Sequence, residues 1–132
     1  MKRTIIFVCE HGSAKSVVAA ALFNRLVKEK KLDFQAFARG TNPDQELAQP
    51  AIDGLLKDGL SAAEQKPTLL SEQDLISAQG LITFCDLPSH YKELISVEDW
   101  SDVPPISVNY DKSRDAMLEY LKQYLDKLEK ES

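Results

Sequence analysis

The apolar positions of the chain follow two periodicities that alternate from the amino terminus onward. Residues 5–8 form a continuous apolar run with β-branched side chains, which is typical of a strand buried on both faces. Between residues 13 and 28 the apolar side chains recur every three or four positions, which predicts a helix. The run FQAFA at residues 34–38 predicts a second short strand.

The middle of the chain shows two further helical patterns. Apolar residues share one helical face over residues 48–56, and Gly59 ends that pattern. Ser71 and Asp74 have the spacing of a capping box, which predicts a short helix around residues 72–78.

Two strands and one helix complete the expected order. Residues 81–84 predict the third strand and residues 106–108 the fourth, while an apolar stripe over the last twenty residues predicts a helix. Strands that alternate with helices indicate an α/β fold with a parallel sheet and helices on both faces. We expect one domain over residues 1–132.

Composition narrows the class of protein. The chain has 132 residues, 43% hydrophobic and 28% charged, which is typical of a globular domain. Its net charge of −5 argues against a nucleic-acid-binding protein, which would show a basic surface. The apolar run near the amino terminus is too short for a secretion signal or a membrane span, so we expect a cytoplasmic protein without membrane association.

The chain contains two cysteines and two histidines. Cys9 and Cys85 lie far apart in a chain that we expect to be intracellular, where structural disulfides are rare. His11 and His90 have no partner three or four residues away, and no C-x-x-C pair is present. We therefore expect no metal site and no cofactor.

The stretch CEHGSAKS at residues 9–16 directly follows the first predicted strand. Ligands of open α/β sheets bind beyond the carboxyl ends of strands, and a loop that leads into a helix turns backbone N–H groups toward an anion. The same environment favours the thiolate form of a cysteine. Gly12 suits a positive φ, Ser13 and Ser16 can donate hydrogen bonds, and Lys15 adds a cation.

A second interpretation of this stretch stays open on spacing alone. Free cysteine is among the most buried residue types, so Cys9 also fits a small core residue. Gly12 and Ser13 before a helix also fit ordinary capping.

The sequence Cys9-Glu10-His11-Gly12-Ser13-Ala14-Lys15-Ser16 resembles the phosphate-binding loop of low-molecular-weight protein tyrosine phosphatases and of the related thioredoxin-coupled arsenate reductases. The likeness extends to residues 38–43, 82–86 and 100–104. It implies a four-stranded parallel sheet of order 2-1-3-4. It also implies that Cys9 is the nucleophile and that phosphate, arsenate or a phosphorylated substrate is bound by Glu10, His11, Gly12, Ser13, Ala14, Lys15 and Ser16.

Three departures from the family pattern bear on the chemistry. Gly12 replaces an asparagine, which keeps the backbone conformation but removes a side-chain amide that braces the loop. Lys15 replaces an arginine, so a point charge stands where a planar bidentate group is usual, and we expect weak activity. The resemblance implies that an aspartate directly before a proline is the general acid, whereas here Val103 separates Asp102 from Pro104. Asp102 is the first candidate for the acid and Asp99 the second; a solvated loop aspartate is the alternative.

Cys85 raises a redox question. In the resembling reductases a second cysteine at this strand end attacks the first, and a third one completes the relay. Lys92 occupies the third position here, so a three-thiol relay is excluded. A two-thiol version stays open, in which Cys85 resolves Cys9 and an external thiol reductant completes the cycle. The alternative is that Cys85 is only a packed residue of the strand. For a phosphotyrosine ring, the candidate contacts are Tyr91, Trp100 and Tyr110.

These features support three functions. The first is an enzyme, either a cysteine-dependent phosphatase or an arsenate reductase, with Cys9 as nucleophile, Lys15 as cation and Asp102 as acid. The second is a binding module that holds an oxyanion or a phosphorylated partner with little turnover. The third is a thiol redox protein that uses Cys9 and Cys85.

Overall fold

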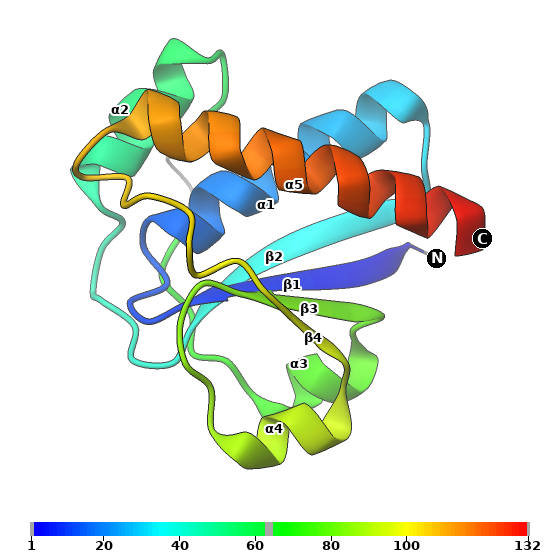
Figure 1. Ribbon diagram of the computed structural model, residues 1–132. Helices are drawn as coiled ribbons and strands as arrows, with labels where there is room; N and C mark the ends of the chain where they lie inside the picture. Colours follow the sequence, from blue (N-terminus) through cyan, green and yellow to red (C-terminus); the bar gives the residue numbers. More distant parts are fainter. Residues whose placement is uncertain (1, 63–64, 132) are drawn as a thin grey trace.

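The strand at the centre of the sheet carries the candidate cysteine at its carboxyl end. The computed structural model describes residues 2–62 and 65–131; Met1, Ala63, Glu64 and Ser132 lie outside the described residues. Its four strands are all parallel and run in the order β2-β1-β3-β4, which confirms the expected topology (Figure 1). The strands are β1 (Arg3–Cys9), β2 (Phe34–Gly40), β3 (Gly80–Thr83) and β4 (Val97–Asp99).

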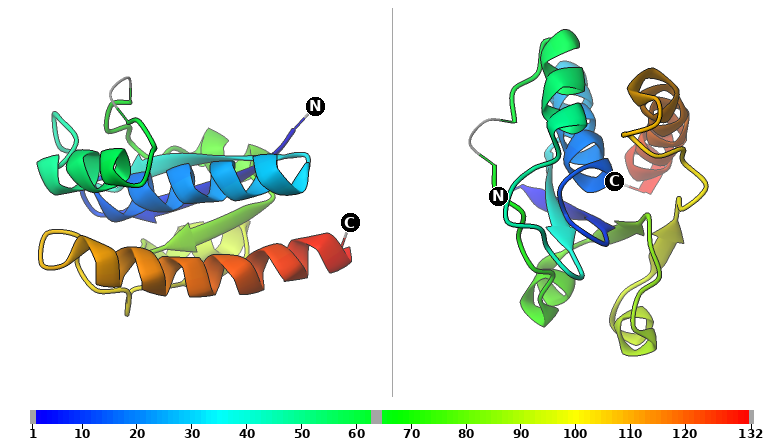
Figure 2. Two further views of the ribbon diagram at one scale, coloured as in Figure 1. Left: turned by 90° about the horizontal axis from the view of Figure 1, so that it is seen from above. Right: turned by 90° about the vertical axis from the view of Figure 1, so that its left-hand side faces the viewer.

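Helices cover both faces of this sheet. They are α1 (Lys15–Lys30), α2 (Gln49–Lys57), α3 (Glu72–Ser77), α4 (Ser89–Leu94) and α5 (Tyr110–Glu131). The end-on view on the right of Figure 2 shows α1, α2 and α5 on one side of the sheet and α3 and α4 on the other. In the described residues no helix is both long enough and apolar enough to span a membrane.

The predicted helix at residues 72–78 begins as its capping box indicates. The Ser71 hydroxyl accepts a hydrogen bond from the Asp74 amide, and the Asp74 carboxylate accepts one from the Ser71 amide. Two orphan N–H groups at the helix start are thereby satisfied.

The prediction of a fourth strand at residues 106–108 is wrong. These residues form a turn, because the Pro105 carbonyl accepts hydrogen bonds from the amides of Val108 and Asn109. In a strand, Ile106 and Val108 would lie on the same face. Ile106 is buried while Val108 is exposed, which fits a turn and not a strand. The fourth strand is β4, whose sequence Val-Glu-Asp is polar and half-exposed at the sheet edge and so gives no apolar run.

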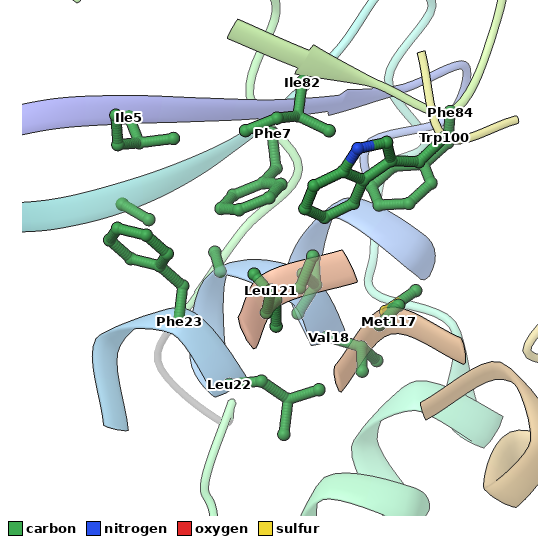
Figure 3. Packing of buried hydrophobic residues seen from close by; sticks show 14 of the residues in the cluster. Ile5, Phe7, Val18, Leu22, Phe23, Ile82, Phe84, Trp100, Met117 and Leu121 are labelled. Atoms are coloured by element: carbon green, nitrogen blue, oxygen red, sulfur yellow. The ribbon is translucent and has the colours of Figure 1, made fainter. Parts of the chain in front are cut away.

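Side chains of β1 alternate between two hydrophobic clusters. Ile5 and Phe7 pack with α1 and α5, whereas Ile6 and Val8 pack on the side of α3. Figure 3 shows Phe7 between the α1 side chains and Trp100, with ring centroids 5.8 Å from Phe23 and 5.9 Å from Trp100. Burial on both faces fixes the position of β1, as its apolar run predicts.

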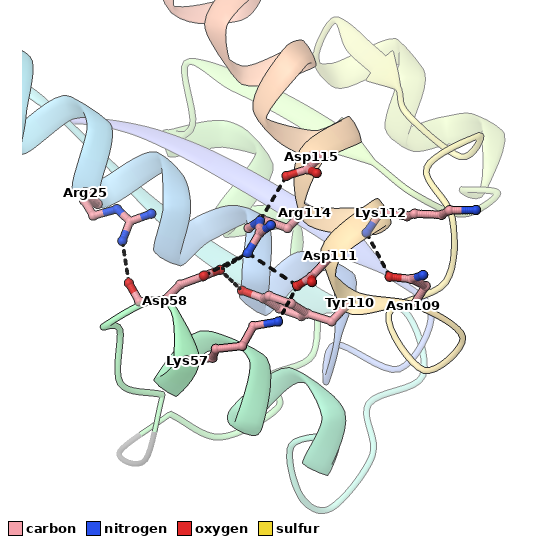
Figure 4. A network of polar contacts seen from close by, with 9 residues as sticks. All are labelled: Arg25, Lys57, Asp58, Asn109, Tyr110, Asp111, Lys112, Arg114 and Asp115. Carbon is pink, nitrogen blue, oxygen red and sulfur yellow. Dashed lines mark hydrogen bonds and ion pairs between the residues drawn. The ribbon is translucent and has the colours of Figure 1, made fainter.

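A polar network joins the end of α2 to the start of α5 (Figure 4). Arg114 donates to both carboxylate oxygens of Asp58 at 2.8 and 3.0 Å, and the Tyr110 hydroxyl donates to Asp58 at 2.8 Å. The Tyr110 ring lies against Gly54, where a Cβ would stand 2.1 Å from the ring. This network fixes the end of the segment that joins β4 to α5.

Asp58 makes part of the stability dependent on pH. Burial acts to raise the pKa of Asp58, but hydrogen bonds from Arg114 and Tyr110 and the nearby positive charges hold it below its ordinary value of 3.8. A carboxyl group whose pKa is lowered by folding stabilises the protein above its unfolded pKa, and this stabilisation is lost as the pH falls through the folded pKa.

We therefore expect Asp58→Asn to lower the free energy of unfolding near neutral pH by about 1–3 kcal/mol. The difference from the wild type should shrink once the pH falls below 3.8. Urea unfolding at several pH values measures both effects. Asp126→Asn, at an exposed position of α5, is the control. A difference between Asp58→Asn and the wild type that stays constant down to strongly acid pH would contradict this account.

Candidate active site

A cavity of about 390 Å³ lies at the carboxyl ends of β1 and β3. Cys9 is the last residue of β1, and α1 begins six residues later at Lys15. The cavity is lined by Cys9, Glu10, His11, Ser13, Ala14, Lys15, Asp44, Ala48, Pro50, Phe84, Cys85, Pro105, Ile106 and Ser107. It is thus the kind of site that open parallel sheets offer to ligands.

The Cys9 thiol is held by a buried hydroxyl. Its Sγ atom lies 3.0 Å from Ser16 Oγ, and Ser16 is fully buried in the first turn of α1. Cys9 itself is a free cysteine that is 8% exposed. The hydroxyl and the first turn of α1 thus lie directly beside the sulfur.

Lys15 is the cation of the loop. Partial burial lowers the pKa of Lys15, and the negative charges of Cys9, Asp102 and Cys85 act in the opposite direction. Its Nζ atom lies 5.9 Å from the centre of the Phe84 ring. The ammonium group therefore stands where it interacts with a Cys9 thiolate and borders the cavity.

Backbone groups of the loop are oriented by the segment at residues 41–48. The carbonyls of residues 9, 10, 11 and 13 accept hydrogen bonds of 2.7–3.3 Å from the amides of residues 41, 42, 44 and 48. In a trans peptide the N–H of the next residue points opposite to the carbonyl. The amides of residues 10, 11, 12 and 14 therefore point away from this segment, as a cradle for an anion requires.

Two glycines let the loop and the end of β2 approach each other. Gly12 has a φ of 61°, which confirms the positive φ expected there. A Cβ on Gly12 would lie 2.9 Å from the Gly40 amide nitrogen, and a Cβ on Gly40 would lie 2.7 Å from the Gly12 nitrogen. Neither position accepts a side chain without a shift of the backbone.

The rim of the cavity carries carboxylates. Asp44 accepts a hydrogen bond of 2.9 Å from the Ser13 hydroxyl, and its other oxygen lies 3.3 Å from His11 Nδ1. His11 Nε2 lies 3.7 Å from the Glu10 carboxylate. Glu10 and Asp44 thus flank His11 beside the candidate anion site.

Asp102 stands outside the cavity lining. Both oxygens of its carboxylate accept from the Tyr120 hydroxyl, at 2.8 and 2.7 Å, and the Tyr120 ring stacks on Trp100. Its negative charge nevertheless opposes the lowering of the Lys15 pKa that burial causes. Asp99, the second candidate for the acid, accepts from the Ser101 amide and lines a separate cavity.

Cys85 lines the same cavity as Cys9. Burial raises the pKa of the Cys85 thiol, and a hydrogen bond with Thr83 partly offsets this effect. The Thr83 hydroxyl lies 3.6 Å from the sulfur. Both cysteines are free in this structure.

The structure brings most of the predicted site residues together. Seven of them line the cavity: Cys9, Glu10, His11, Ser13, Ala14, Lys15 and Cys85. Gly12 and Ser16 support the loop from outside the lining, through Gly40 and Cys9. Across residues 2–62 and 65–131 there is no group of three or more His, Cys, Asp or Glu side chains placed to hold a metal ion.

The expected aromatic contacts are not in the lining. Trp100 is buried in the core, Tyr110 is bonded to Asp58, and Tyr91 packs in the cluster on the opposite face of the sheet. The aromatic side chain of the cavity is Phe84, which sequence reasoning missed together with Asp44. Both follow strands whose carboxyl ends lie beside Cys9, and that position is the signal that would have indicated them.

A comparison of two glycine substitutions distinguishes the effect of the close contact between Gly12 and Gly40 from the effect of backbone strain. Gly59 also has a positive φ, of 80°, but a Cβ there would meet nothing within 4 Å. We expect Gly59→Ala to cost about 1–2 kcal/mol from strain alone. Gly12→Ala should cost more and should also abolish phosphate binding, because the loop must move. Thermal melting and calorimetric titration with phosphate test this; equal effects of the two substitutions would contradict it.

The comparisons with known proteins agree with this geometry. The family model described as low molecular weight phosphotyrosine protein phosphatase matches residues 4–120. No curated protein matches the chain at a significant level. Solved structures share the fold, among them the following three. YfkJ from Bacillus subtilis has a TM-score of 0.85 at 19% identity, covering 100% of this chain and 98% of that chain.

A mutant of YwlE from Bacillus subtilis has a TM-score of 0.82 at 19% identity, with 97% and 99% of the two chains covered. An arsenate reductase in its phosphate-binding state has a TM-score of 0.78 at 18% identity, with 95% and 98% covered. Identities this low speak for the fold alone, whereas the family model spans most of the sequence. The chain belongs to the low molecular weight phosphotyrosine protein phosphatase family.

Proposed function

We propose that this protein is a cysteine-dependent phosphatase of the phosphotyrosine or small-phosphoester type. The observation that carries the proposal is the Cys9 sulfur in the lining of the cavity, 3.0 Å from the Ser16 hydroxyl and within the electrostatic influence of Lys15. A sulfur nucleophile beside a hydroxyl, a cation and loop amides is the arrangement that nucleophilic displacement at phosphorus requires.

The proposed reaction has two displacements. The Cys9 thiolate attacks phosphorus, the bond from phosphorus to the ester oxygen breaks, and the leaving oxygen receives a proton. Water then attacks the phosphocysteine and releases phosphate and the free thiolate. Loop amides and Lys15 would stabilise the equatorial oxygens, since donors aimed at developing charge lower the barrier.

We assign the general acid to Asp102. Its charge interacts with Lys15, which borders the anion site, and that interaction favours Asp102 over Asp99. Since the Tyr120 hydroxyl holds both of its oxygens outside the cavity lining, Asp102 must leave Tyr120 to reach a leaving group.

The first prediction concerns Cys9 and Lys15. We expect release of phosphate from a small aryl phosphate that is weak in the wild type and lost in Cys9→Ser. Lys15→Arg restores a bidentate donor, and the loss of one such donor typically costs about 10²–10³ in rate. The turnover number should therefore rise in that variant, whereas Lys122→Arg at an exposed position of α5 should leave it unchanged.

Two results of this assay would count against the proposal. Turnover that survives in Cys9→Ser would exclude Cys9 as the nucleophile. No turnover in either the wild type or Lys15→Arg would mean that the acid or the cradle is also missing. The remaining candidates would then be an oxyanion-binding module and a redox protein.

The second prediction concerns the acid. General acid catalysis contributes about 10²–10⁴ in rate and matters most when the leaving group is poor. Asp102→Asn should therefore slow hydrolysis of phosphotyrosine far more than hydrolysis of para-nitrophenyl phosphate, whose leaving group needs no proton. Equal slowing of the two substrates would instead indicate a structural role for Asp102. The control is Asp126→Asn, which should slow neither.

Arsenate reduction is the second candidate function, because Cys85 lines the same cavity as Cys9. In that reaction the Cys85 thiolate would attack the sulfur of a Cys9–arsenate adduct. The electrons of the sulfur–arsenic bond would pass to arsenic, arsenite would leave, and an external thiol would reduce the resulting disulfide. The raised pKa of Cys85 makes it the poorer thiolate, so we rank this function below the phosphatase.

A further inference from the structure

Among the side chains that line the cavity above Cys9, carboxylates outnumber lysines and arginines. Among the described residues that line it, Glu10 and Asp44 are carboxylates and Lys15 is the lysine. A Cys9 thiolate adds a further negative charge. Such a balance is unusual for a site that binds a phosphate dianion, because like charges close together disfavour binding.

Asp44 cannot turn away from the cavity without losing its bonds. Its carboxylate accepts from the Ser13 hydroxyl at 2.9 Å, and Ser13 is only 3% exposed. Its amide donates to the His11 carbonyl at 2.9 Å, so the backbone is fixed as well. These bonds fix the position of the Asp44 carboxylate at the rim.

Glu10 completes the acidic rim next to the nucleophile. It follows Cys9 directly, its side chain is 64% exposed, and its carboxylate lies 3.7 Å from His11 Nε2. His11 stands between Glu10 and Asp44 with half of its side chain exposed. Glu10 and Asp44, which we call the acidic rim, thus both line the cavity and are both exposed to solvent.

The loop and Lys15 attract the phosphoryl group, while the acidic rim acts on whatever lies beside it. A carboxylate next to the phosphate would be repelled by the rim, and a lysine or arginine would be attracted. Charges this exposed interact over about 8 Å at physiological ionic strength, so the rim acts mainly on groups close to the phosphate.

We propose that Glu10 and Asp44 make this site selective for phosphoryl groups that have a positive charge beside them. The substrate class is a phosphotyrosine peptide with lysine or arginine next to the phosphorylated residue. This inference rests on the proposed phosphatase function and adds the specificity of the same site. The alternative is that both carboxylates only brace the loop, in which case the charge of the substrate has no effect.

Two peptides of equal length test the inference. Both contain one phosphotyrosine, flanked on each side by lysine in the first peptide and by glutamate in the second, so the leaving group is the same. At low ionic strength we expect the wild type to hydrolyse the lysine peptide with a kcat/KM about tenfold higher, since each exposed ion pair contributes a factor of about 1.4–5. High salt should bring the ratio toward one.

Charge-removing variants assign the preference to the rim. Asp44→Asn keeps an oxygen that accepts from Ser13, and Glu10→Gln changes an exposed side chain, so both should fold. Each should reduce the ratio between the two peptides, and the double variant should bring it close to one. Asp126→Asn removes a carboxylate from an exposed position of α5 far along the chain and should leave the ratio unchanged.

Equal kcat/KM for the two peptides in the wild type, or a preference retained by the double variant, would overturn the inference. Failure of the phosphatase proposal gives a different result, in which neither peptide is hydrolysed. Calorimetric titration of Cys9→Ser with the same peptides then decides the charge preference by binding alone. Tighter binding of the lysine peptide supports the inference, and equal binding rejects it.

Discussion

Burial of β1 on both faces is the constraint on which the site depends. Its side chains pack alternately toward α1 and α5 and toward α3, so the strand has one possible register and its last residue one possible place. That residue is Cys9. The chain must then turn within five residues into α1, and this turn packs Gly12 against Gly40 and forms four backbone hydrogen bonds with residues 41–48. The cradle is thus a consequence of core packing.

The cradle has the shape of an anion site, but its charged groups act on an anion in opposite directions. The loop amides and Lys15 favour an anion, whereas Glu10 and Asp44 oppose one at the rim. Lys15 supplies the charge of an arginine without its second hydrogen bond, so it holds an oxyanion less firmly in one orientation. A ligand that brings its own cation relieves the repulsion at the rim. The proposed preference for basic neighbours therefore follows from the carboxylates at the rim.

The sequence predicted the elements that have a hydrophobic pattern or a local capping signal, and it missed the elements that have neither. The apolar run of β1 and the capping box at Ser71 have local causes, and both are present in the structure. β4 and α4 were missed because β4 is a polar edge strand and α4 has no buried residue in its span, so neither gives a hydrophobic period. Asp44 and the Tyr120 bond to Asp102 depend on contacts between distant segments, which spacing does not encode.

The central claim is that Cys9 forms a covalent bond to phosphorus. Its most direct test is rapid acid quenching of the protein during turnover of a phosphotyrosine peptide, followed by mass spectrometry of the fragment that contains residues 9–16. The account predicts one phosphoryl group on Cys9 and none on the fragment that contains Cys85. Turnover with no phosphoryl group on Cys9, or with one on another side chain, would contradict it.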